Sequence, residues 1–582
     1  MTLALSGQVV EAGIAVGQAH NIQRNEIEIG EYRIETQRID GEIQRLLDAV
    51  REASDKLQDL ALRLRATAGA SGEEIVRAHL AMLNDSSLVQ AATEHIRDQL
   101  CNAEWALQLQ LEALLAEFRS IDDDYLRSRE EDVAQVVRMV QQQLSEESEE
   151  LPLSDVPDRL GHTLVVATEL TPAQLAVLHE RGVAGVITEH GSPYSHTAIL
   201  ARGMGIPIVM GVHRAQSLIT EGEQLVLDGA YGIVFADPEP SILNYYLAKQ
   251  SESDRYRQNL AALRHEPASS LDGQPVCLLA NAERGADIRQ ALSDGAEGVG
   301  LLRSEYLFMQ GTPPDEEGQL AHYREAVDAL EGAPLTIRTL DIGADKTPEL
   351  LRFESLRNLP NPALGLRAVR LCLREMDLFQ TQLRAILRAA AYGPVRCMIP
   401  MLTTDREVLA VRSLIDELRL ELKKEGLASA DTLELGGMIE VPAAALALES
   451  VGRKLDFISI GTNDLIQYTL AADRVDENVA HLYDPEHPGV IHLLSHIFRT
   501  AKRMQLPVAV CGELAGDRRY TRLLLALGLT EFSMQPRSLL EIKKVIRETD
   551  VGKARAALDQ WTAGEAPDLT LAQMLNQSQL NH

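Results

Sequence analysis

The chain has 582 residues, of which 45% are hydrophobic and 24% are charged, and its formal net charge is -30. A chain this long exceeds what one hydrophobic core supports, so we expect several domains, and the negative charge argues against a nucleic-acid partner. No run of 18 apolar residues and no secretion signal occurs, and the five cysteines lack paired spacing, so we expect a cytoplasmic protein that is not membrane-embedded.

The first part of the chain predicts a small α/β domain that is interrupted by helices. Short apolar runs before residue 25, and again between 164 and 235, are typical of strands. From about 31 to 148, apolar residues recur at helical spacing and proline is absent. We therefore expect an α/β domain over 1–30 and 150–238, with an all-helical subdomain over 31–149 inserted into it.

The second part predicts a TIM barrel. A polar, helical stretch over 239–270 is interpreted as a linker helix. Beyond it, apolar strands alternate with helix-like stretches, and the eight strands are expected at 276–280, 298–302, 335–340, 397–401, 437–440, 457–461, 508–512 and 531–534. Eight alternating units over about 300 residues indicate a (β/α)8 barrel, which we place at 271–582.

Charged residues follow several of the predicted barrel strands. In such barrels the chemistry lies on the loops after the strands, so these side chains should meet on one rim. Two carboxylates, Glu440 and Asp464, could hold Mg2+ while leaving positions for substrate oxygens. Guanidinium groups bind phosphate in a paired fashion, and four of them are candidates on this rim: Arg303, Arg338, Arg367 and Arg474. This set suits phosphoryl transfer.

Two further residues carry candidate chemistry. Cys511 lies at the end of the seventh predicted strand. A lone cysteine in a strand is usually a small buried hydrophobic residue, but the charged neighbours of Cys511 favour a role in proton transfer. His196 precedes the apolar helical stretch 198–201, so we expect it near a helix N-terminus, where free N–H groups stabilise a phosphate on the imidazole. An unperturbed pKa of about 6.5 leaves this imidazole mostly neutral and nucleophilic.

These motifs, read together, resemble enzyme I of the bacterial phosphoenolpyruvate:sugar phosphotransferase system. The likeness covers nearly all of the chain, and its specific motifs are SHT at 195–197, GLLRSE at 300–305, RTLDIG at 338–343, NPALGLR at 361–367 and GTNDL at 461–465.

The resemblance implies a function and a set of site residues. His196 would take the phosphoryl group of phosphoenolpyruvate and pass it to the carrier protein HPr, releasing pyruvate as the first step of sugar uptake. Glu440 and Asp464 would bind Mg2+, and Cys511 would protonate the enolate. The helical insert would dock HPr, and the barrel would form a homodimer. The implied substrate-binding residues are Arg303, Arg338, Arg367, Lys346, Asn463, Asp464 and Arg474.

The chain departs from the family pattern at three places, of which one directly precedes the histidine motif and one lies two residues before Lys346. The sequence 191–194 is GSPY where a glycine pair and a threonine are usual, Ala344 stands in a usual glycine pair, and Leu175 stands where a hydroxyl residue is frequent. These changes leave each candidate acid, base and metal ligand in place, although they bear on the orientation of His196.

Three alternative functions stay open at this stage. A pyruvate-phosphate dikinase or phosphoenolpyruvate synthase would need an additional nucleotide-binding domain, for which we expect no room. A nitrogen-regulatory paralogue normally carries an extra N-terminal sensor domain. A non-catalytic regulator would have no use for the combination of His196, Glu440, Asp464 and Cys511.

Overall fold

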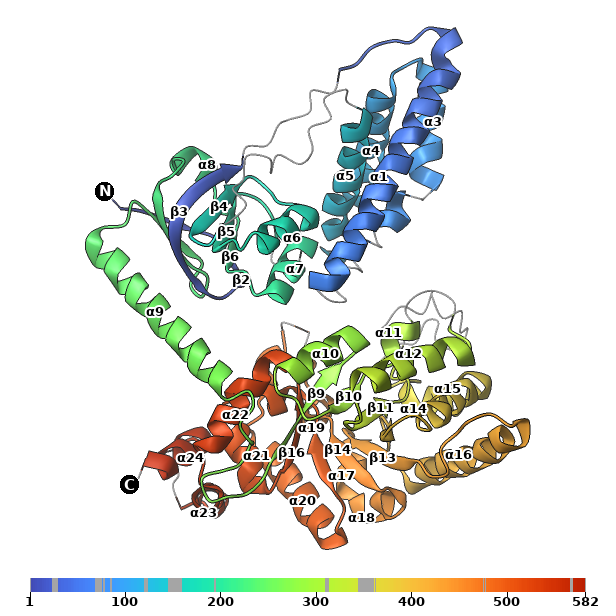
Figure 1. Ribbon diagram of the computed structural model, residues 1–582, viewed down its shortest axis with the longest axis vertical. Coiled ribbons are helices and arrows are strands. Elements are labelled where there is room, and N and C mark those ends of the chain that lie inside the picture. Colours follow the sequence, from blue (N-terminus) through green and yellow to red (C-terminus); the bar gives the residue numbers. More distant parts are fainter. Residues whose placement is uncertain are drawn as a thin grey trace. The chain divides into compact units, whose positions relative to one another are not determined.

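Two sheets organise the chain, one open and one closed (Figure 1). In the computed structural model they belong to two separate units, Met1–Tyr256 (unit 1) and Arg257–His582 (unit 2), which are described individually. The predicted domain boundaries remain predictions. The structure describes residues 2–22, 30–67, 76, 79–83, 86–119, 124–144, 160–192, 195–308, 313–343, 361, 363–474, 476, 478–565 and 569–580.

Unit 1 contains a mixed sheet with the strand order β1-β8-β7-β3-β4-β5-β6-β2. Strands β3 to β6 pair in parallel, and the others add antiparallel edges. The parallel strands β4 and β5 are apolar almost throughout and largely buried, as expected for strands that are covered on both faces. The strands are β1 (Leu3–Ser6), β2 (Gln8–Glu11), β3 (Ile14–Ile22), β4 (Thr163–Ala167), β5 (Gly185–Thr188), β6 (Ile208–Met210), β7 (Gln224–Asp228) and β8 (Ile233–Ala236).

Helices lie between β3 and β4 in the chain, as predicted for the inserted subdomain. They are α1 (Ile39–Thr67), α3 (Ser86–Gln99), α4 (Ala103–Arg119) and α5 (Asp124–Leu144). On α1, Leu46, Ala49, Ala53 and Leu57 recur at helical spacing and are buried, so one face of the helix enters a core. The other helices of unit 1 are α6 (Pro172–Glu180), α7 (His196–Met204), α8 (Ala215–Leu218) and α9 (Pro240–Ala262).

Unit 2 is the predicted TIM barrel. Eight strands close in the order β9 to β16, and each pairs in parallel with its neighbours. All eight overlap the predicted runs. They are β9 (Cys277–Ala282), β10 (Val299–Leu302), β11 (Leu335–Arg338), β12 (Val395–Ile399), β13 (Glu434–Ile439), β14 (Phe457–Ile460), β15 (Val508–Val510) and β16 (Glu531–Met534).

Helices separate the barrel strands along the chain and continue after the last one. The described helices are α10 (Gly285–Ser293), α11 (Glu305–Phe308), α12 (Glu316–Ala329), α14 (Ala368–Cys372), α15 (Met376–Ala389), α16 (Asp405–Glu425), α17 (Pro442–Leu446), α18 (Leu448–Val451), α19 (Thr462–Leu470), α20 (Pro488–Met504), α21 (Thr521–Leu527), α22 (Leu539–Arg547), α23 (Val551–Thr562) and α24 (Leu571–Leu580). Within the described part of the chain, none of the helices combines the length and the apolar character that crossing a bilayer requires.

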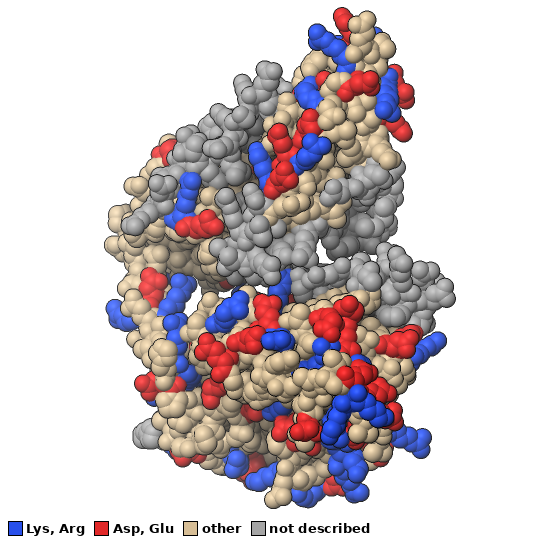
Figure 2. Space-filling view, turned by 45° about the vertical axis from the view of Figure 1, so that its right-hand side comes forward, with Lys and Arg blue, Asp and Glu red and all other residues tan. Residues whose placement is uncertain are grey.

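Ion pairs join helices that surround the barrel. Arg384 and Arg388 of α15 contact the Glu316 carboxylate at 2.6 and 2.5 Å, and Arg384 contacts Glu425 of α16 at 2.6 Å. Glu316 begins α12, where a negative charge is also favoured by the helix dipole. Charges of both signs are interspersed over the face of unit 2 that Figure 2 shows.

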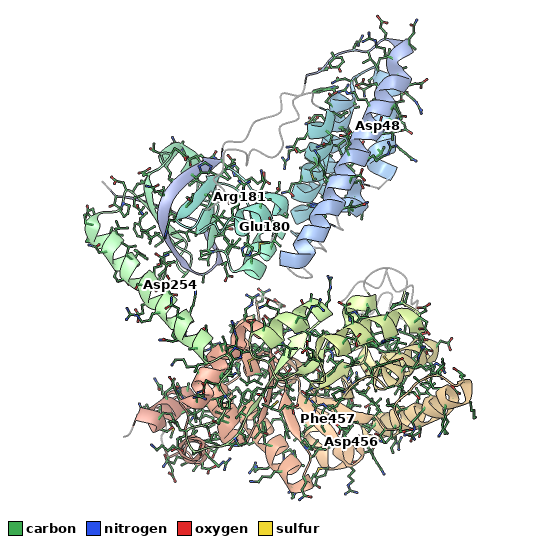
Figure 3. All side chains as sticks on the ribbon, viewed as in Figure 1. Asp48, Glu180, Arg181, Asp254, Asp456 and Phe457 are labelled. Carbon is green, nitrogen blue, oxygen red and sulfur yellow. The ribbon has the colours of Figure 1, made fainter. Side chains whose placement is uncertain are left out.

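The barrel interior is filled by side chains from several strands. A buried cluster joins Leu301, Met398, Met438, Phe457 and Cys511. Figure 3 labels Phe457 and its neighbour Asp456, which is exposed and accepts a hydrogen bond from Arg412 Nη2 at 2.9 Å. Phe457, the first residue of β14, therefore lies inside the barrel, whereas Asp456, which precedes the strand, is exposed.

Gly436 on β13 makes room for that ring. A Cβ added at Gly436 would lie 2.2 Å from Phe457 Cζ, so Gly436→Ala should destabilise the barrel by about 1–3 kcal/mol. Urea unfolding of the full chain measures this loss. The control is Gly41→Ala on α1, where nothing lies within 4 Å of an added Cβ. Equal unfolding midpoints for both variants would contradict the packing argument.

Candidate active site

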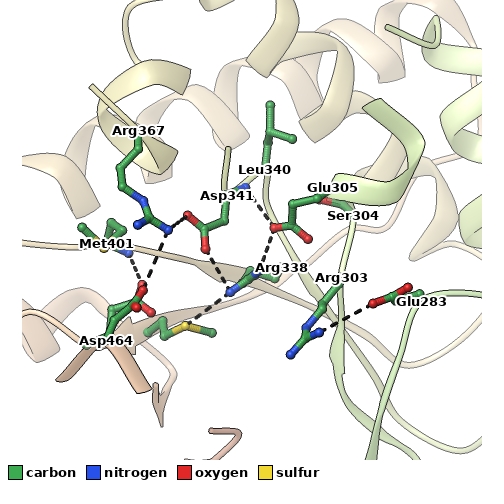
Figure 4. Close-up of polar contacts among 12 residues, drawn as sticks. Glu283, Arg303, Ser304, Glu305, Arg338, Leu340, Asp341, Arg367, Met401 and Asp464 are labelled. Atoms are coloured by element: carbon green, nitrogen blue, oxygen red, sulfur yellow. Dashed lines mark hydrogen bonds and ion pairs between the residues drawn. The ribbon is translucent and has the colours of Figure 1, made fainter. Parts of the chain in front are cut away.

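Arg338 is the last residue of β11 and is held by carboxylates on two sides (Figure 4). Its Nη2 donates to Glu305 Oε1 at 2.7 Å, and its Nη1 lies 3.1 Å from Asp341 Oδ2. Burial acts to lower the pKa of Arg338, but Glu305 and Asp341 outweigh it and raise that pKa. The guanidinium therefore stays charged although its side chain is only 11% exposed.

Arg367 meets Arg338 through the same aspartate. It precedes α14, and its Nη2 donates to Asp341 Oδ1 at 2.9 Å. Asp341 is also fixed through its main chain, whose N–H donates to Glu305 Oε1 at 3.1 Å. Burial of Arg367 is again outweighed by Asp341 and Asp464, which raise its pKa. One buried carboxylate thus holds two buried guanidinium groups side by side.

The other two candidate arginines are more exposed and pair with carboxylates that are themselves exposed. Arg303 Nη1 lies 3.6 Å from Glu283 Oε1, and Arg474 Nη1 donates to Glu513 Oε1 at 3.0 Å. Glu513 Oε1 also accepts from Asn463 Nδ2 at 3.1 Å, while the Glu513 N–H donates to Asn463 Oδ1 at 2.9 Å. Exposed pairs of this kind are weak and can exchange for a substrate anion.

Glu440 and Asp464 follow β13 and β14, and both belong to this group of charges. Glu440 is buried, and its Oε1 accepts from the Met401 N–H at 2.6 Å. Burial raises the pKa of Glu440 to about 8, and the nearby carboxylates of Asp341 and Asp464 add to that rise. Asp464 Oδ2 lies 3.8 Å from Arg367 Nη2. Crowded carboxylates of this kind suit an added cation.

The described residues form no complete protein cage for a metal. No group of three or more His, Cys, Asp and Glu side chains in the described residues is placed to hold an ion. The donor set of Glu440 and Asp464 nevertheless fits Mg2+, which binds through one or two carboxylates and takes its other oxygens from substrate and water. Burial, followed by repulsion from Asp341 and Asp464, raises the pKa of Glu440, and a bound cation would offset both by stabilising the ionised carboxylate.

Cys511 lies directly after β15 and is buried. Its N–H donates to the Ile460 carbonyl at 3.2 Å, and its Sγ lies 3.8 Å from the same oxygen. Burial raises the pKa of the Cys511 thiol to about 11, against the opposing influence of Ser459 and Arg338. The thiol therefore keeps its proton at neutral pH, which a proton donor requires.

His196 is the first residue of α7, as the sequence predicted. Ser195 caps that helix, because its side chain accepts from the Ala198 N–H at 3.3 Å. Thr197 Oγ1 donates to the Leu170 carbonyl at 2.9 Å and fixes the first turn. The side chain of His196 and all of Lys346 lie outside the described residues. Their predicted roles are therefore untested.

The neighbouring departure at Leu175 has a structural explanation. Leu175 lies on α6, is fully buried, and packs in a core with Leu178 and Leu200. It therefore contributes to the apolar contact between α6 and α7. Residues 193 and 194 of the GSPY departure, and Ala344, lie outside the described part of the chain.

Comparison with known proteins gives matches along nearly the whole length. Three families match: "PEP-utilising enzyme, N-terminal" at 6–129, "PEP-utilising enzyme, mobile domain" at 161–232 and "PEP-utilising enzyme, PEP-binding domain" at 257–551. The phosphoenolpyruvate-protein phosphotransferase of Cupriavidus necator is 42% identical over 568 residues, which cover 96% of this chain and 97% of that protein. The chain belongs to the phosphoenolpyruvate-protein phosphotransferase family.

Further members of this family are similar over the same span. The Geobacillus stearothermophilus protein is 36% identical and covers 96% of each chain. The Haemophilus influenzae protein is 35% identical, covering 99% of this chain and 100% of its own. Because these matches run through both units, they confirm the resemblance that the motifs indicated.

In this member of the phosphotransferase family, several buried residues that hold the site in place had no predicted role. Glu305 lies two residues after Arg303, and Asp341 lies three residues after Arg338. A carboxylate so close in sequence to a candidate arginine was a signal that could have identified both residues. Gln382 on α15 had no such signal. Its Nε2 lies 3.1 Å from Ser304 Oγ and its Oε1 accepts from the Leu340 N–H at 2.9 Å, so it joins the loops after β10 and β11.

The raised pKa of Glu440 gives a stability test. The folded chain binds this proton more tightly than the unfolded chain, so stability should fall as pH rises from about 4.5 to about 8. The slope is limited to about 1.4 kcal/mol per pH unit. Glu440→Gln should therefore raise the melting temperature in chelator at pH 9, and much less at pH 5.

The control for this test is Glu434→Gln, at the exposed start of the same strand. It should change the melting temperature little at either pH. An equal gain for Glu440→Gln at pH 5 and pH 9 would contradict the charge argument.

Proposed function

We propose that this chain transfers the phosphoryl group of phosphoenolpyruvate to its own His196 and then to a histidine of HPr, releasing pyruvate. The observation that carries this proposal is the pair of buried guanidinium groups, Arg338 and Arg367, held by Asp341 beside the carboxylates Glu440 and Asp464. A site with this charge pattern suits a small, multiply charged anion together with a cation. Family membership supports the same reaction.

The arginines divide into two groups with different tasks. Arg338 and Arg367 are locked in place by buried carboxylates, so they supply fixed positive charge without reorganisation when substrate binds. Arg303 and Arg474 exchange their weaker carboxylate partners for the phosphate and carboxylate of phosphoenolpyruvate. Asn463, Asp464 and Lys346 complete the proposed substrate contacts.

Glu440 and Asp464 are the residues that would hold Mg2+. When bound, the ion neutralises negative charge on substrate oxygens and on these carboxylates. Glu440 must lose its proton for this role, and its Oε1 is already oriented by the Met401 N–H.

Cys511 supplies the proton that completes pyruvate. As the bond from the imidazole nitrogen of His196 to phosphorus forms, the bond between phosphorus and the enol oxygen breaks and leaves an enolate. The carbon at position 3 then takes the proton of the Cys511 thiol, and the resulting thiolate regains a proton from water. The raised pKa of Cys511 keeps this proton available at neutral pH.

Delivery of the phosphoryl group uses the other unit. The N-terminus of α7, capped by Ser195, supports the proposal that free N–H groups there stabilise phosphate on His196. We assign HPr docking to the helical insert at 31–149, and the downstream process to sugar uptake.

Labelled substrate tests the proposal. With Mg2+, HPr and phosphoenolpyruvate labelled at phosphorus, label should appear on the chain and then on HPr. His196→Ala should reduce both to background, because no other imidazole would occupy the helix N-terminus. The control is His213→Ala, an exposed histidine of the same unit, which should label normally.

Other outcomes of this experiment identify the alternatives. Labelling that requires ATP would indicate a dikinase, and absence of label from the unmodified chain would indicate a non-catalytic regulator. Normal labelling of His196→Ala would refute the proposed nucleophile.

We also propose a homodimer formed through unit 2. Leu409 and Leu420 on α16 are 44% and 56% exposed, and Leu446 on α17 is 67% exposed. A contact with a second copy that covered these side chains would remove apolar surface from water. Sedimentation of the full chain should give twice the monomer mass, and cross-links between copies should fall within 257–582. A monomer at micromolar concentration, or cross-links confined to unit 1, would contradict this proposal.

A further inference from the structure

A polar side chain on β9, the first strand of the barrel, contacts the residue that follows β15, which is Cys511. Asn281 is the penultimate residue of β9, and its Nδ2 donates to the Cys511 carbonyl at 3.0 Å, across 230 residues of sequence. The strand between them in the barrel is β16. Asn281 therefore reaches past one strand to hold the loop that begins with the proposed proton donor.

Asn281 is itself held in one orientation. Its Oδ1 accepts from Ser533 Oγ at 2.6 Å, and Ser533 is fully buried on β16. Because the amide oxygen is occupied by a hydroxyl donor, the amide nitrogen is directed to the Cys511 carbonyl. The hydrogen bonds run from Ser533 through Asn281 to Cys511.

The opposite side of Cys511 is held by a different strand. Its N–H donates to the Ile460 carbonyl of β14 at 3.2 Å. The two peptide groups that flank the Cys511 Cα are thus fixed from β14 and from β9. When these two peptide groups are fixed, the direction of the Cys511 Cα–Cβ bond is fixed as well. That direction limits the positions that Sγ can take.

We propose that Asn281 is a positioning residue for proton delivery, because it holds the main chain of Cys511 so that Sγ faces one side of the enolate. This inference rests on the proposed function, in which Cys511 protonates carbon 3. Phosphoryl transfer to His196 does not use the thiol. A misplaced thiol should therefore impair protonation and leave phosphorylation of His196 in place.

The geometry predicts a stereochemical consequence. Proton transfer is sensitive to placement, and a displacement of about 1 Å can cost about 100-fold in rate. An enolate that is not protonated by Cys511 leaves as enolpyruvate and takes a proton from water on either face. Loss of positioning should then appear as loss of handedness in the new methyl group.

The test uses phosphoenolpyruvate that carries one deuterium and one tritium on carbon 3 in a defined geometry. The full-length chain converts it in ordinary water with Mg2+ and HPr, and the handedness of the pyruvate methyl group is measured. The unmodified chain should give one handedness in large excess. Asn281→Ala and Asn281→Asp should lose most of that excess, while label from phosphoenolpyruvate still reaches His196.

Handedness separates positioning from a merely structural role. A variant that only unfolds part of the population makes less pyruvate, but each turnover keeps its stereochemistry. Ser533→Ala should lose less handedness than the Asn281 variants, because Asn281 keeps its own bond to Cys511. The control is Thr549→Val, which removes a fully buried hydroxyl elsewhere in unit 2 and should retain the full excess.

The outcomes also distinguish this inference from the function on which it rests. Full handedness in Asn281→Asp or in Asn281→Ala would overturn the role of Asn281. Full handedness in Cys511→Ala would instead remove Cys511 as the proton donor. If Asn281→Ala does not fold, Asn281→Asp decides the question by the same measurement.

Discussion

The carboxylate of Asp341 is the contact on which the barrel site depends. It pairs with Arg338 at 3.1 Å and with Arg367 at 2.9 Å, and two guanidinium groups would repel each other in this buried place without it. Glu305 stabilises the same group by accepting from Arg338 and from the Asp341 main chain. Because removing one partner of a buried pair leaves an uncompensated charge, these residues stabilise the site as a unit.

The site brings positive and negative side chains close together. The pairing of arginines with carboxylates differs between the buried part of the site and its rim. Deep arginines have permanent carboxylate partners, whereas the rim arginines Arg303 and Arg474 have partners that are exposed to water. Burial raises the pKa of Glu440 to about 8, and the carboxylates of Asp341 and Asp464 add to that rise against the opposing charge of Arg338. A cation that binds with a multiply charged substrate would offset this rise, which is the physical link between the structure and phosphoryl transfer.

The proton-transfer side of the chemistry depends on burial and on the main chain. Cys511 lies among apolar side chains of the barrel interior, and this raises the pKa of its thiol to about 11. Such a thiol is inert as a nucleophile but retains a proton for a strongly basic carbon. The orientation of Cys511 is set by main-chain hydrogen bonds to Ile460 of β14 and to Asn281 of β9. The closure of the barrel therefore helps to place the thiol proton.

The amino-acid sequence by itself determined the strands, the barrel and the rim positions of Arg338, Glu440 and Asp464, because hydrophobic periodicity and strand ends are local properties. The helix that begins at His196 was predicted for the same reason. Only the tertiary structure decided that Asp341 bridges two arginines and that Asn281 holds Cys511. Those contacts join residues up to 230 positions apart, and their geometry exists only once the parallel strands close into a barrel.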